Sequence, residues 1–461
     1  MKTIDLEGKK LYFIGVGGIG MSGIAKILLT MGYDISGSDI ADSALTAALS
    51  DMGGKIYIGH QAANLGPDIE AVIYSSAIKP GNPELDEAKR RGLPVYKRAE
   101  ALAFLMSLRQ SIGVAGAHGK TTTSGMIALM LELVGADPTV IIGGTLPQLK
   151  SNAKGGGGGQ LVAEADESDG TFLLLNPAIA IVTNIEPDHL DHYQCLENII
   201  EAFEQYISQL PPDGLAVVNL DCPNVRALKD RVPANYITYA LTKEADYQAK
   251  DLEFRCDGIS ATVYEKEKPL GRLDLFVPGE HNISNALAAI AIGRYLGFDF
   301  AELAAALSRF VGTGRRFELL GEVDGVRVID DYAHHPTEIR ATVKSARDLG
   351  AKRIVGVFQP HRYTRTKSMY KEFAAAFGQC DITIINEIYP AFERPLPGVT
   401  SQLIVDEAKA QGQQNVFYAA TEADVLELLQ QYTQPGDLLL IMGAGNIRRA
   451  GEKFAGRKKG R

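Results

Sequence analysis

The chain has 461 residues, of which 46% are hydrophobic and 22% are charged, and its formal net charge is −9. This length exceeds what one hydrophobic core usually serves, so we expect two or three domains, and the acidic balance argues against a general nucleic-acid-binding protein. The four cysteines are too few and too scattered for a disulfide scaffold, and no signal peptide or apolar membrane span is present, so we expect a cytoplasmic protein without membrane insertion.

The first hundred residues alternate between strand and helix patterns, which predicts a parallel sheet with helices on its faces. Strands are expected at residues 11–15, 34–38 and 71–74, with a helix from about Met21. The glycines at 15–20 fit G-x-G-x-x-G, and Asp39 follows the next strand. Such a motif indicates a nicotinamide or flavin site, another nucleotide on the same backbone, or a structural turn. The first two weigh about equally, because the motif reports diphosphate and ribose rather than the base.

A second series begins with an apolar strand at 112–115, continues through a glycine-rich turn at 116–122, and leads into a helix-like run at 126–134. This order makes a phosphate cradle of backbone N–H groups and a helix N-terminus. The Walker A spacing is imperfect, since Val114 stands where the first glycine belongs. Lys120 supplies a charge for phosphates and Thr121 a hard oxygen for magnesium, so the chain is predicted to bind a nucleoside triphosphate.

Two further strands of this series end in clusters of metal-type ligands. Residues 164–169 bring four carboxylates to the end of the strand at 161–165, and residues 183–193 follow the strand at 178–183. A solvated acidic loop is the alternative for the first cluster, but the end of a strand beside a phosphate loop is where a magnesium ligand belongs. A helix at 285–296 is expected to close this middle region.

The third series has strands near 326–329, 353–358, 382–385 and 438–442, each followed by a polar loop at 330–336, 359–365, 387–395 or 443–446. Ligands of open α/β sheets bind beyond the carboxyl ends of the strands, so these loops predict a third binding face. Arg315 and Arg316 precede it. They suit either a surface ion pair or contact with a γ-phosphate when domains close.

Taken together, these motifs resemble those of the Mur amino-acid ligases of peptidoglycan synthesis, and within that family the alanine-adding branch. The resemblance covers all three regions in order. It rests on G-V-G-G-I-G-M-S-G-I-A at 15–25, G-A-H-G-K-T-T-T at 116–123, E-A-D-E-S-D-G-T-F at 164–172, T-N-I-E-P-D-H-L-D-H-Y at 183–193, H-N-I-S-N-A-L at 281–287, G-R-R-F-E at 314–318, D-D-Y-A-H-H-P-T-E at 330–338 and F-Q-P-H-R-Y-T-R-T at 358–366.

Departures from the family pattern are few. Ala117 replaces a threonine that is usual in the phosphate loop, and Asn446 replaces an aspartate usual after the last G-A-G. Several related ligases use a carbamylated lysine for the second magnesium. This chain has no lysine between Lys154 and Lys229, which supports the alanine-adding branch.

The resemblance implies an α/β fold of three domains and a division of labour among them. Residues 1–107 would form a Rossmann-like domain that binds UDP-N-acetylmuramate rather than NAD, residues 108–314 a P-loop ATPase-type domain that binds ATP, and residues 315–461 a Rossmann-like domain that binds L-alanine. The residues implied for the UDP-sugar are Gly17, Gly18, Ile19, Gly20, Met21, Ser22, Asp39, His60, Ser75 and Ser76.

The resemblance likewise implies the ATP and amino-acid sites. ATP would contact Gly116, Ala117, His118, Gly119, Lys120, Thr121, Thr122, His281, Asn285, Arg316 and Asp331; magnesium would be held by Thr121, Glu164 and His189; and L-alanine would meet Tyr332, His334, Arg362 and Arg365. Lys120, Glu164, His189, Arg316 and His334 are the expected catalytic residues. The implied reaction forms an acyl phosphate from the lactyl carboxylate and then an amide.

Two alternatives remain at this stage. One is the recycling ligase that attaches an intact tripeptide to the same UDP-sugar, whose glycine loop and acidic loop usually differ from those here. The other belongs to a different class: a nicotinamide-dependent oxidoreductase, or a nucleotide-sensing protein, built on the first glycine motif.

Overall fold

The computed structural model describes residues 4–456, and the chain divides into two compact units. Unit 1 comprises Met1–Ala249, Val263–Gly271 and Ser284–Leu307, and unit 2 comprises Lys250–Thr262, Arg272–Ile283 and Ser308–Arg461. The α/β class predicted from the sequence is confirmed. The boundaries after residues 107 and 314 stay predictions.

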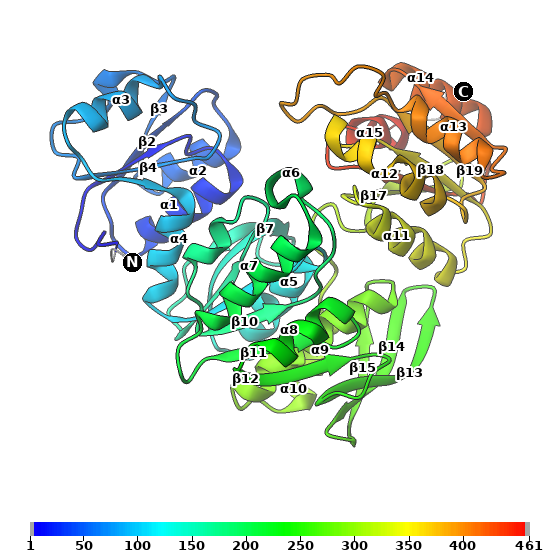
Figure 1. Ribbon diagram of the computed structural model, residues 1–461, viewed down its shortest axis with the longest axis horizontal. Helices are drawn as coiled ribbons and strands as arrows, with labels where there is room; N and C mark the ends of the chain where they lie inside the picture. Colours follow the sequence, from blue (N-terminus) through cyan, green and yellow to red (C-terminus); the bar gives the residue numbers. More distant parts are fainter. Residues whose placement is uncertain (1–3, 457–461) are drawn as a thin grey trace. The chain divides into compact units, whose positions relative to one another are not determined.

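The first sheet of unit 1 is parallel and has the strand order β3-β2-β1-β4-β5 (Figure 1, blue to cyan). This order brings the carboxyl ends of β1, β2 and β4 together, as the glycine motif requires. Helix α1 begins at Ile19, slightly before the predicted start at Met21. The elements are β1 (Leu11–Ile14), α1 (Ile19–Thr30), β2 (Ile35–Asp39), α2 (Ala44–Asp51), β3 (Lys55–Ile58), β4 (Ala71–Tyr74), α3 (Pro83–Arg90), β5 (Val95–Lys97) and α4 (Arg98–Ser107).

The second sheet has ten strands in the order β15-β14-β13-β12-β11-β10-β6-β9-β7-β8. The strands predicted at 112–115, 161–165 and 178–183 are its β6, β9 and β10, whereas the predicted helix at 285–296 begins earlier, as α9. The elements are β6 (Gln110–Ala115), α5 (Lys120–Leu133), β7 (Thr139–Leu146), β8 (Ser151–Lys154), β9 (Gln160–Glu164), β10 (Ile179–Val182), α6 (Leu190–Tyr193), α7 (Leu196–Ser208), β11 (Leu215–Asn219), α8 (Pro223–Arg231), β12 (Asn235–Ala240), β13 (Tyr247–Arg255), β14 (Gly258–Glu265), β15 (Lys268–Leu275), α9 (Glu280–Tyr295) and α10 (Phe300–Leu307).

One apolar core connects the first sheet with the strands β6 and β9 of the second. It includes Phe13 and Ile24 on the first side and Ala163 on the other, all fully buried. Helix α1 lies against β7 and β8. The Asn152 side-chain amide donates to the Ile19 carbonyl at 3.0 Å. This packing fixes the first glycine loop relative to the second sheet within unit 1.

The third sheet lies in unit 2 and has the order β16-β17-β21-β18-β19-β20, parallel except for β16 (Figure 1, yellow to red). One apolar cluster joins it to α11, α12 and α13, and another joins it to α14 and α15, so both faces are covered. Its elements are β16 (Glu318–Val323), β17 (Val326–Asp331), α11 (Pro336–Asp348), β18 (Ile354–Phe358), α12 (Tyr363–Ala376), β19 (Ile382–Asn386), α13 (Gln402–Ala410), β20 (Val416–Ala419), α14 (Glu422–Tyr432), β21 (Leu438–Met442) and α15 (Arg448–Ala455).

Two of the loops predicted in unit 2 are shorter than expected. Asp330 and Asp331 belong to β17, where they pair in parallel register with β21. Arg365 lies in the first turn of α12 rather than in a loop, because the helix starts at Tyr363, immediately after Arg362, whose φ is +72°. The polar residues still gather at the carboxyl edge of the sheet.

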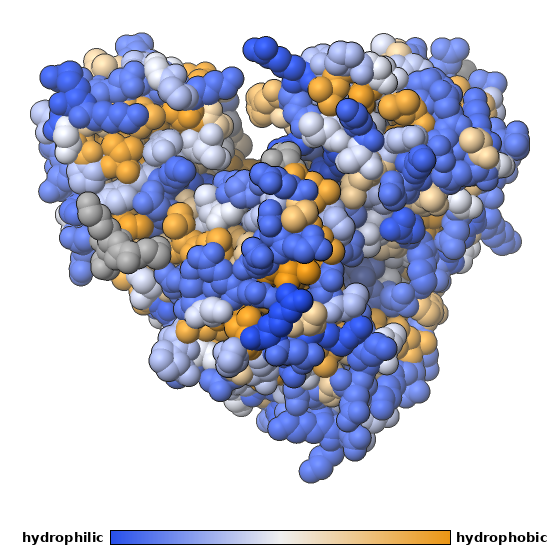
Figure 2. All heavy atoms as spheres, viewed as in Figure 1, coloured by the Kyte–Doolittle hydropathy of each residue, from blue (hydrophilic) through white to orange (hydrophobic). Residues whose placement is uncertain are grey.

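The exposed large apolar side chains include those of Ile40, Val311 and Phe392. Figure 2 shows hydrophilic residues over most of the face in view. Within residues 4–456, no helix is long and apolar enough to cross a membrane.

Candidate active site

The turn between β6 and α5 depends on glycine at both ends. Gly116 has φ +132° and Gly119 has φ +83°, conformations that other residues rarely adopt. A Cβ at Gly116 would also lie 2.1 Å from the Thr183 hydroxyl oxygen. The turn therefore brings the backbone of residues 116–119 to the N-terminus of α5, which is the geometry of an anion-binding loop.

Lys120 points back across this loop. Its ammonium group donates to the Gly116 carbonyl at 2.6 Å and to a Glu167 carboxylate oxygen at 2.9 Å. Burial opposes the charge, but Glu167, Asp166 and Glu164 outweigh it and raise the pKa of Lys120 above its usual value. Lys120 is thus a permanent cation at the phosphate loop.

Glu167 is a site residue that sequence reasoning did not select. It is 3% exposed, and burial raises its pKa to about 7 although Lys120 opposes the shift. Its Oε2 atom has no hydrogen-bond partner among the residues described. The only sequence signal was its place in the carboxylate-rich string at 164–169, which does not reveal which acidic side chain turns inward.

The predicted metal ligands Thr121 and Glu164 lie together. The Thr121 hydroxyl donates to Glu164 Oε2 at 2.9 Å, and the backbone N–H of Gly143 donates to the same oxygen at 2.8 Å. A Cβ at Gly143 would lie 2.5 Å from this carboxylate. The close approach of β7 thereby orients Glu164 toward the phosphate loop.

His189, the third predicted metal ligand, enters from the segment after β10. It precedes α6 in a left-handed conformation, with φ +51°. Its Nε2 atom lies 3.7 Å from Glu167 Oε1 and 3.6 Å from Asp188 Oδ2. The structure therefore brings His189 to the inward-facing carboxylate rather than to an unrelated surface.

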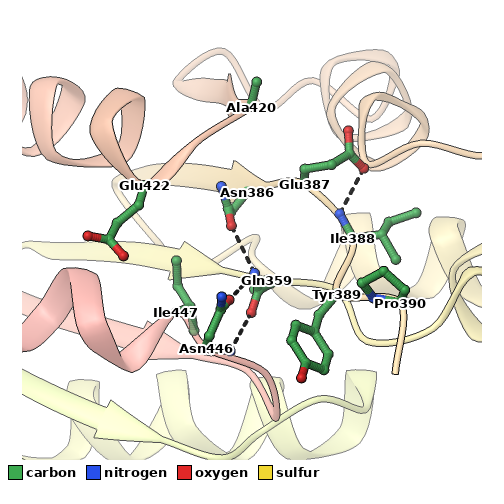
Figure 3. A pocket seen from close by; sticks show the side chains of 10 residues that line it. All are labelled: Gln359, Asn386, Glu387, Ile388, Tyr389, Pro390, Ala420, Glu422, Asn446 and Ile447. Carbon is green, nitrogen blue, oxygen red and sulfur yellow. Dashed lines mark hydrogen bonds between the residues drawn. The ribbon is translucent and has the colours of Figure 1, made fainter. Parts of the chain in front are cut away.

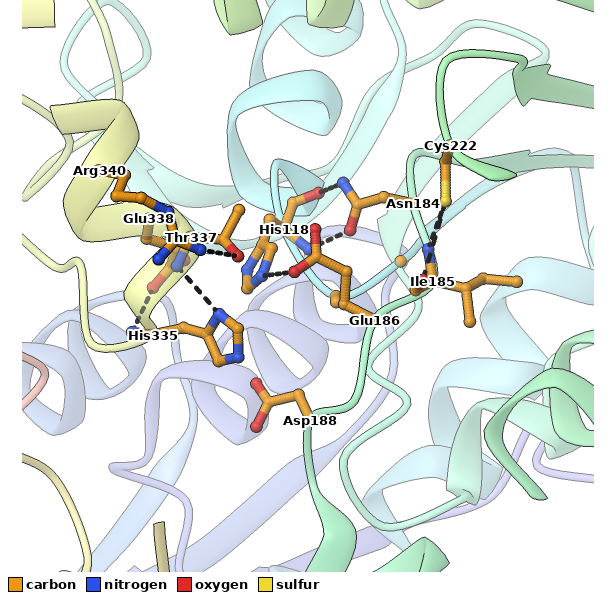
Figure 4. Close-up of polar contacts among 12 residues, drawn as sticks. His118, Asn184, Ile185, Glu186, Asp188, Cys222, His335, Thr337, Glu338 and Arg340 are labelled. Atoms are coloured by element: carbon orange, nitrogen blue, oxygen red, sulfur yellow. Dashed lines mark hydrogen bonds and ion pairs between the residues drawn. The ribbon is translucent and has the colours of Figure 1, made fainter. Parts of the chain in front are cut away.

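The rest of the phosphate loop forms hydrogen bonds with the segment that follows β10. The Asn184 side chain accepts from the His118 N–H at 2.8 Å and donates to the His118 carbonyl at 3.0 Å, and the His118 ring faces Glu186 (Figure 4). Ala117 N–H donates to the Asn184 carbonyl. The last of these contacts uses only the backbone of Ala117, so it does not require the threonine side chain that is usual there.

Asn285, expected near adenine, lies beneath the phosphate loop. Its Oδ1 accepts from the Thr123 hydroxyl at 3.1 Å and would lie 2.8 Å from a Cβ at Gly119. Thr122 precedes Thr123 on the same turn of α5 and is buried. His281 is exposed, four residues before Asn285 on α9. The hydrogen bond between Thr123 and Asn285 supports the start of α5 below the loop. Contacts of His281 and Asn285 with adenine stay predictions.

The glycine loop of the first sheet is arranged differently. The Gly17 N–H donates to Asp39 Oδ2 at 2.8 Å, so Asp39 closes the loop at the end of β2. The Ser22 hydroxyl donates to the Ile19 carbonyl at 3.1 Å within the first turn of α1. Ser75 and Ser76 follow β4 at the same carboxyl edge, with Ser76 exposed.

His60 is held by a fully buried carboxylate. Glu84 is 0% exposed, and its Oε2 lies 3.0 Å from His60 Nδ1 while it accepts from the Ser38 hydroxyl at 2.6 Å. Tyr12 OH and the Asn64 amide donate to its other oxygen. The Ser38 hydroxyl also lies 3.0 Å from His60 Nδ1, so Glu84 and Ser38 together orient the ring. Sequence reasoning missed Glu84, since its partners are scattered over the chain.

A cavity of about 320 Å³ in unit 1 lies between the first glycine loop and the carboxylates at the end of β9. Its wall includes residues 18–21 of the first loop and Ser75 on one side, and Glu164 and Asp166 on the other. Arg98 and Leu102 of α4, and residues 141–143 of β7, complete it. A single ligand can therefore touch the first glycine loop and the carboxylates beside the phosphate loop.

In unit 2, the predicted nucleotide residues Arg316 and Asp331 surround Tyr332. The Arg316 guanidinium lies 5.4 Å from the Tyr332 ring centroid and 3.2 Å from Glu338. Asp331 accepts from the N–H groups of Phe317 and Ala333, both at 2.8 Å. Burial raises the pKa of Asp331 to about 6, against the opposing effect of Arg316.

The predicted amino-acid residues begin a row of rings in unit 2. Tyr332 and His334 are 5.3 Å apart, His334 and His361 are 5.8 Å apart, and His361 stacks on Tyr389 at 5.8 Å. His334 Nδ1 lies 3.0 Å from the Tyr332 carbonyl and 3.2 Å from Glu338, so it carries the proton.

The two predicted arginines of the amino-acid site lie at the start of α12. Arg362 caps the helix, its N–H donating to the Tyr389 carbonyl at 2.9 Å, and Arg365 is in the first turn. At the start of α11 the His335 ring caps the helix by its side chain instead, accepting from the Thr337 N–H at Nδ1 (Figure 4). Sequence reasoning did not select Tyr389, which only pairing between two loops brings to this edge.

Asn446, the second departure from the family pattern, belongs to an amide cluster. Gln359 donates to Asn386 at 3.0 Å and to Asn446 Oδ1 at 2.9 Å, and the Asn446 N–H donates back to Gln359 (Figure 3). The cluster lines a cavity of about 330 Å³ that also contains Glu387 and Glu422. Asparagine keeps the acceptor oxygen of aspartate without adding a third negative charge.

Comparison with known proteins assigns each region to one family. The profile described as "Mur ligase family, catalytic domain" matches residues 10–110, "Mur ligase middle domain" matches residues 114–293, and "Mur ligase, glutamate ligase domain" matches residues 315–445.

Full-length relatives agree with these profiles. A UDP-N-acetylmuramate–L-alanine ligase of Desulforamulus reducens is 51% identical, covering 96% of this chain and 97% of its own length. One of Pelotomaculum thermopropionicum is 49% identical, covering 98% of each chain. The crystal structure of a UDP-N-acetylmuramate–alanine ligase from Thermotoga maritima superposes with a TM-score of 0.80 at 31% identity, over 97% of this chain and 98% of that one. A murein peptide ligase from Psychrobacter arcticus, at 24% identity and a TM-score of 0.71, shares the fold.

Proposed function

The chain belongs to the Mur ligase family, and on that premise we propose that it uses ATP to join L-alanine to the lactyl carboxylate of UDP-N-acetylmuramate. The full-length relatives named above carry this activity in their names. The substrates are small molecules. A cytoplasmic location and the absence of a nucleic-acid partner stay predictions.

The cavity in unit 1 is the observation that carries this proposal. It is lined both by the glycine loop at 18–21 and by Glu164, which the Thr121 hydroxyl contacts beside the phosphate loop. A sugar nucleotide whose diphosphate rests on the first loop can extend its lactyl carboxylate toward the second. An NAD-dependent oxidoreductase would not need, across this cavity, a carboxylate that contacts the first residues after a phosphate loop.

ATP is bound through the loop at 116–122, with Lys120 directed at its phosphates. The Lys120 ammonium donates to Glu167 and to the Gly116 carbonyl, so a cation lies close to the loop. Arg316 and Asp331 of unit 2 are proposed to serve the phosphates and ribose of the same nucleotide, and His281 and Asn285 the adenine.

Magnesium fits the side chains at this site. The Thr121 hydroxyl and the Glu164 carboxylate are hard oxygen ligands, and the buried Glu167 Oε2 lacks a hydrogen-bond partner within the described part of the chain. Thr121, Glu164 and His189 would hold the metal. When bound, magnesium would neutralise the charge that develops on the transferred phosphoryl group.

The proposed reaction has two steps. A lactyl carboxylate oxygen attacks the γ-phosphorus of ATP, and the bond from that phosphorus to the bridging oxygen breaks. ADP departs, and the product is an acyl phosphate. The amine of L-alanine then attacks the acyl carbon, and the tetrahedral adduct collapses to amide and inorganic phosphate. Lys120 compensates the charge in the first step, because a fixed cation stabilises the transition state more than the substrate.

The second step needs a group that accepts a proton from the amine. His334 is our candidate, since its Nδ1 proton faces the Tyr332 carbonyl and leaves Nε2 as the basic nitrogen of the neutral ring. Tyr332, Arg362 and Arg365 are proposed to bind L-alanine, with an arginine pairing its carboxylate.

Phosphate release tests the function directly. The purified protein should release phosphate only when UDP-N-acetylmuramate, ATP and L-alanine are all present. If the tripeptide replaces L-alanine with greater efficiency, the recycling activity is the correct one. Tight binding of NAD or NADP, with none of UDP-N-acetylmuramate, would overturn the assignment of the first glycine loop and of Asp39.

A further inference from the structure

The carboxylate of Glu393 lies at the start of α12, the helix that carries the arginines proposed for L-alanine. Glu393 belongs to the loop that follows β19, and it accepts from the Thr364 hydroxyl at 2.6 Å and from the Thr364 N–H at 3.1 Å. Thr364 stands between Arg362 and Arg365 in the chain. The loop therefore brings one negative charge to the helix turn that carries two positive charges.

The loop after β19 reaches this position through an uncommon backbone conformation. Tyr389, near its start, accepts from the Arg362 N–H at 2.9 Å, and Glu393 contacts the same helix start four residues later. Between these two contacts, Ala391 has φ +47° and Phe392 has φ +71°, and Phe392 is 100% exposed. Residues other than glycine seldom adopt this left-handed conformation, and such strain is concentrated at functional sites. Here the strained turn is what returns Glu393 to the helix.

Capping of α12 alone does not explain this arrangement. The N-cap residue is Arg362, whose side chain makes no capping hydrogen bond, and Arg365 adds a second cation to the first turn. Helix N-termini disfavour cations, and serine, threonine, aspartate or asparagine is the usual cap. A helix that needed only a stable start would carry such a side chain at position 362, whereas this one receives a carboxylate that is 29 residues from Thr364. The charges at this turn are better explained by a ligand.

Other carboxylates at this edge of the sheet already serve the protein. Asp331 accepts from two backbone N–H groups. Glu338 accepts from the His334 N–H at 2.9 Å and lies 3.2 Å from Nδ1 of the same histidine. Glu393 is partly exposed, and Thr364 occupies two of the roughly four lone-pair sites that an ionised carboxylate offers. Glu393 therefore has acceptor capacity for a ligand that approaches from solvent.

We propose that Glu393 binds the ammonium group of L-alanine while Arg365 pairs with its carboxylate. This inference rests on the proposed function, since it takes L-alanine as the ligand. The two charged groups of an α-amino acid are attached to one carbon atom, so the side chains that bind them must be neighbours, as Glu393 and the first turn of α12 are. Glu393 binds the ammonium form in which the amino acid arrives, and His334 accepts the proton that is lost before the amine attacks.

Competition between L-alanine and propionate tests this role, because propionate is L-alanine without its ammonium group. In the phosphate-release assay, Glu393→Gln should raise the KM for L-alanine about 10- to 100-fold, as expected for a lost charge-assisted contact. The inhibition constant of propionate should not change, and kcat and the KM values for ATP and UDP-N-acetylmuramate should change much less than the KM for L-alanine. Arg365→Ala, in contrast, should weaken the binding of both L-alanine and propionate.

Glu372→Gln is the matched control. Glu372 is an exposed carboxylate further along α12, and the same substitution there should change neither the KM for L-alanine nor the inhibition by propionate. Glu393→Asp should recover part of the affinity for L-alanine, because it keeps the charge on a shorter side chain. The thermal midpoint of Glu393→Gln should stay close to that of the wild type, since its amide oxygen still accepts from Thr364.

The outcomes separate a ligand-binding role from a structural one. If Glu393→Gln weakens L-alanine and propionate equally, Glu393 only positions α12, and an unchanged KM for L-alanine would show that it has no role in binding. Either result overturns this inference and leaves the ligase function standing. A wild-type protein that releases no phosphate with L-alanine would contradict the proposed function itself.

Discussion

The two glycine-containing loops of unit 1 hold anions by different means. The loop at 116–119 is followed by its own cation, Lys120, which three carboxylates keep charged, and it tolerates no side chain at Gly116. The loop at 15–20 has no cation, and Asp39 already accepts its Gly17 N–H. The side chain that lies over it is that of Arg98, which is 78 residues further along the chain than Gly20.

The comparison shows that a charge can be part of the loop's own sequence motif or can be brought to the loop by a distant segment of the fold. A phosphate that is transferred needs a cation fixed within the loop, whereas a phosphate that is only held can be served by a neighbouring helix. We therefore expect the substrate-binding loop at 15–20 to have the less specific sequence motif, and the catalytic loop at 116–119 to have the more specific one.

Removing Lys120 should give the largest effect, and it should impair only the function of the loop at 116–119. Lys120→Ala is expected to lower kcat at least about 100-fold, because a preorganised charge at the transferring phosphate is lost. UDP-N-acetylmuramate affinity should stay near that of the wild type, as measured by calorimetry. Equal losses of activity and of sugar-nucleotide affinity would contradict the separate roles of the two loops.

Adding a methyl group to each loop sharpens the contrast in backbone constraint. Gly116→Ala places a Cβ 2.1 Å from Thr183 Oγ1 at φ +132°, and should destabilise the protein by roughly 2 to 3 kcal/mol. Gly18→Ala has φ −66° and its nearest non-adjacent atom at 3.7 Å, so its cost should be below about 1 kcal/mol. Thermal unfolding of both variants is the measurement, and similar losses would show that the loops are equally constrained.

A third anion, the carboxylate of L-alanine, should depend on neither loop. Arg365→Ala is expected to raise the KM for L-alanine about 10- to 100-fold, with little change for UDP-N-acetylmuramate. Lys367, exposed on the same helix, provides the control variant. A large change in the ATP titration instead would move Arg365 to the nucleotide and leave the amino-acid site to be found elsewhere in unit 2.

The buried Glu167 beside Lys120 predicts a smaller effect, a dependence of protein stability on pH. Burial raises the pKa of Glu167 from 4.5 to about 7, so folding takes up a proton between these values and stability falls as pH rises through them. Glu167→Gln lacks this titration. The thermal midpoint of the wild type should therefore decrease relative to that of Glu167→Gln between pH 5 and pH 8. If the two midpoints change equally with pH, the pKa of Glu167 is not raised in the folded protein.

The sequence predicted those parts of the site that are local in the chain. The strands, the glycine turns and Lys120 follow from patterns a few residues long, and the structure contains them. The contact between Thr121 and Glu164, which are 43 residues apart, agrees with a ligand pair that only the family resemblance implied. The ends of elements were less accurate. Strand β17 runs through Asp331 because it pairs with β21 as far as that residue, and α12 starts before Arg365, directly after the N-cap residue Arg362.

Contacts between distant segments could not be predicted. Glu84 reaches His60 across 24 residues, and the partners of Glu84 come from β1, β2 and the segment after β3. Glu167 is one of four similar carboxylates, and only packing shows that it faces Lys120. Arg98 joins the first loop because α4 packs near α1.

The central claim is that a carboxylate carried on the first loop attacks a phosphate held on the second. Ligation of UDP-N-acetylmuramate labelled with ¹⁸O in both lactyl carboxylate oxygens, followed by mass spectrometry of the released phosphate, tests it most directly. An acyl-phosphate route transfers one labelled oxygen to phosphate for each amide formed. Unlabelled phosphate, released together with amide, would contradict the account.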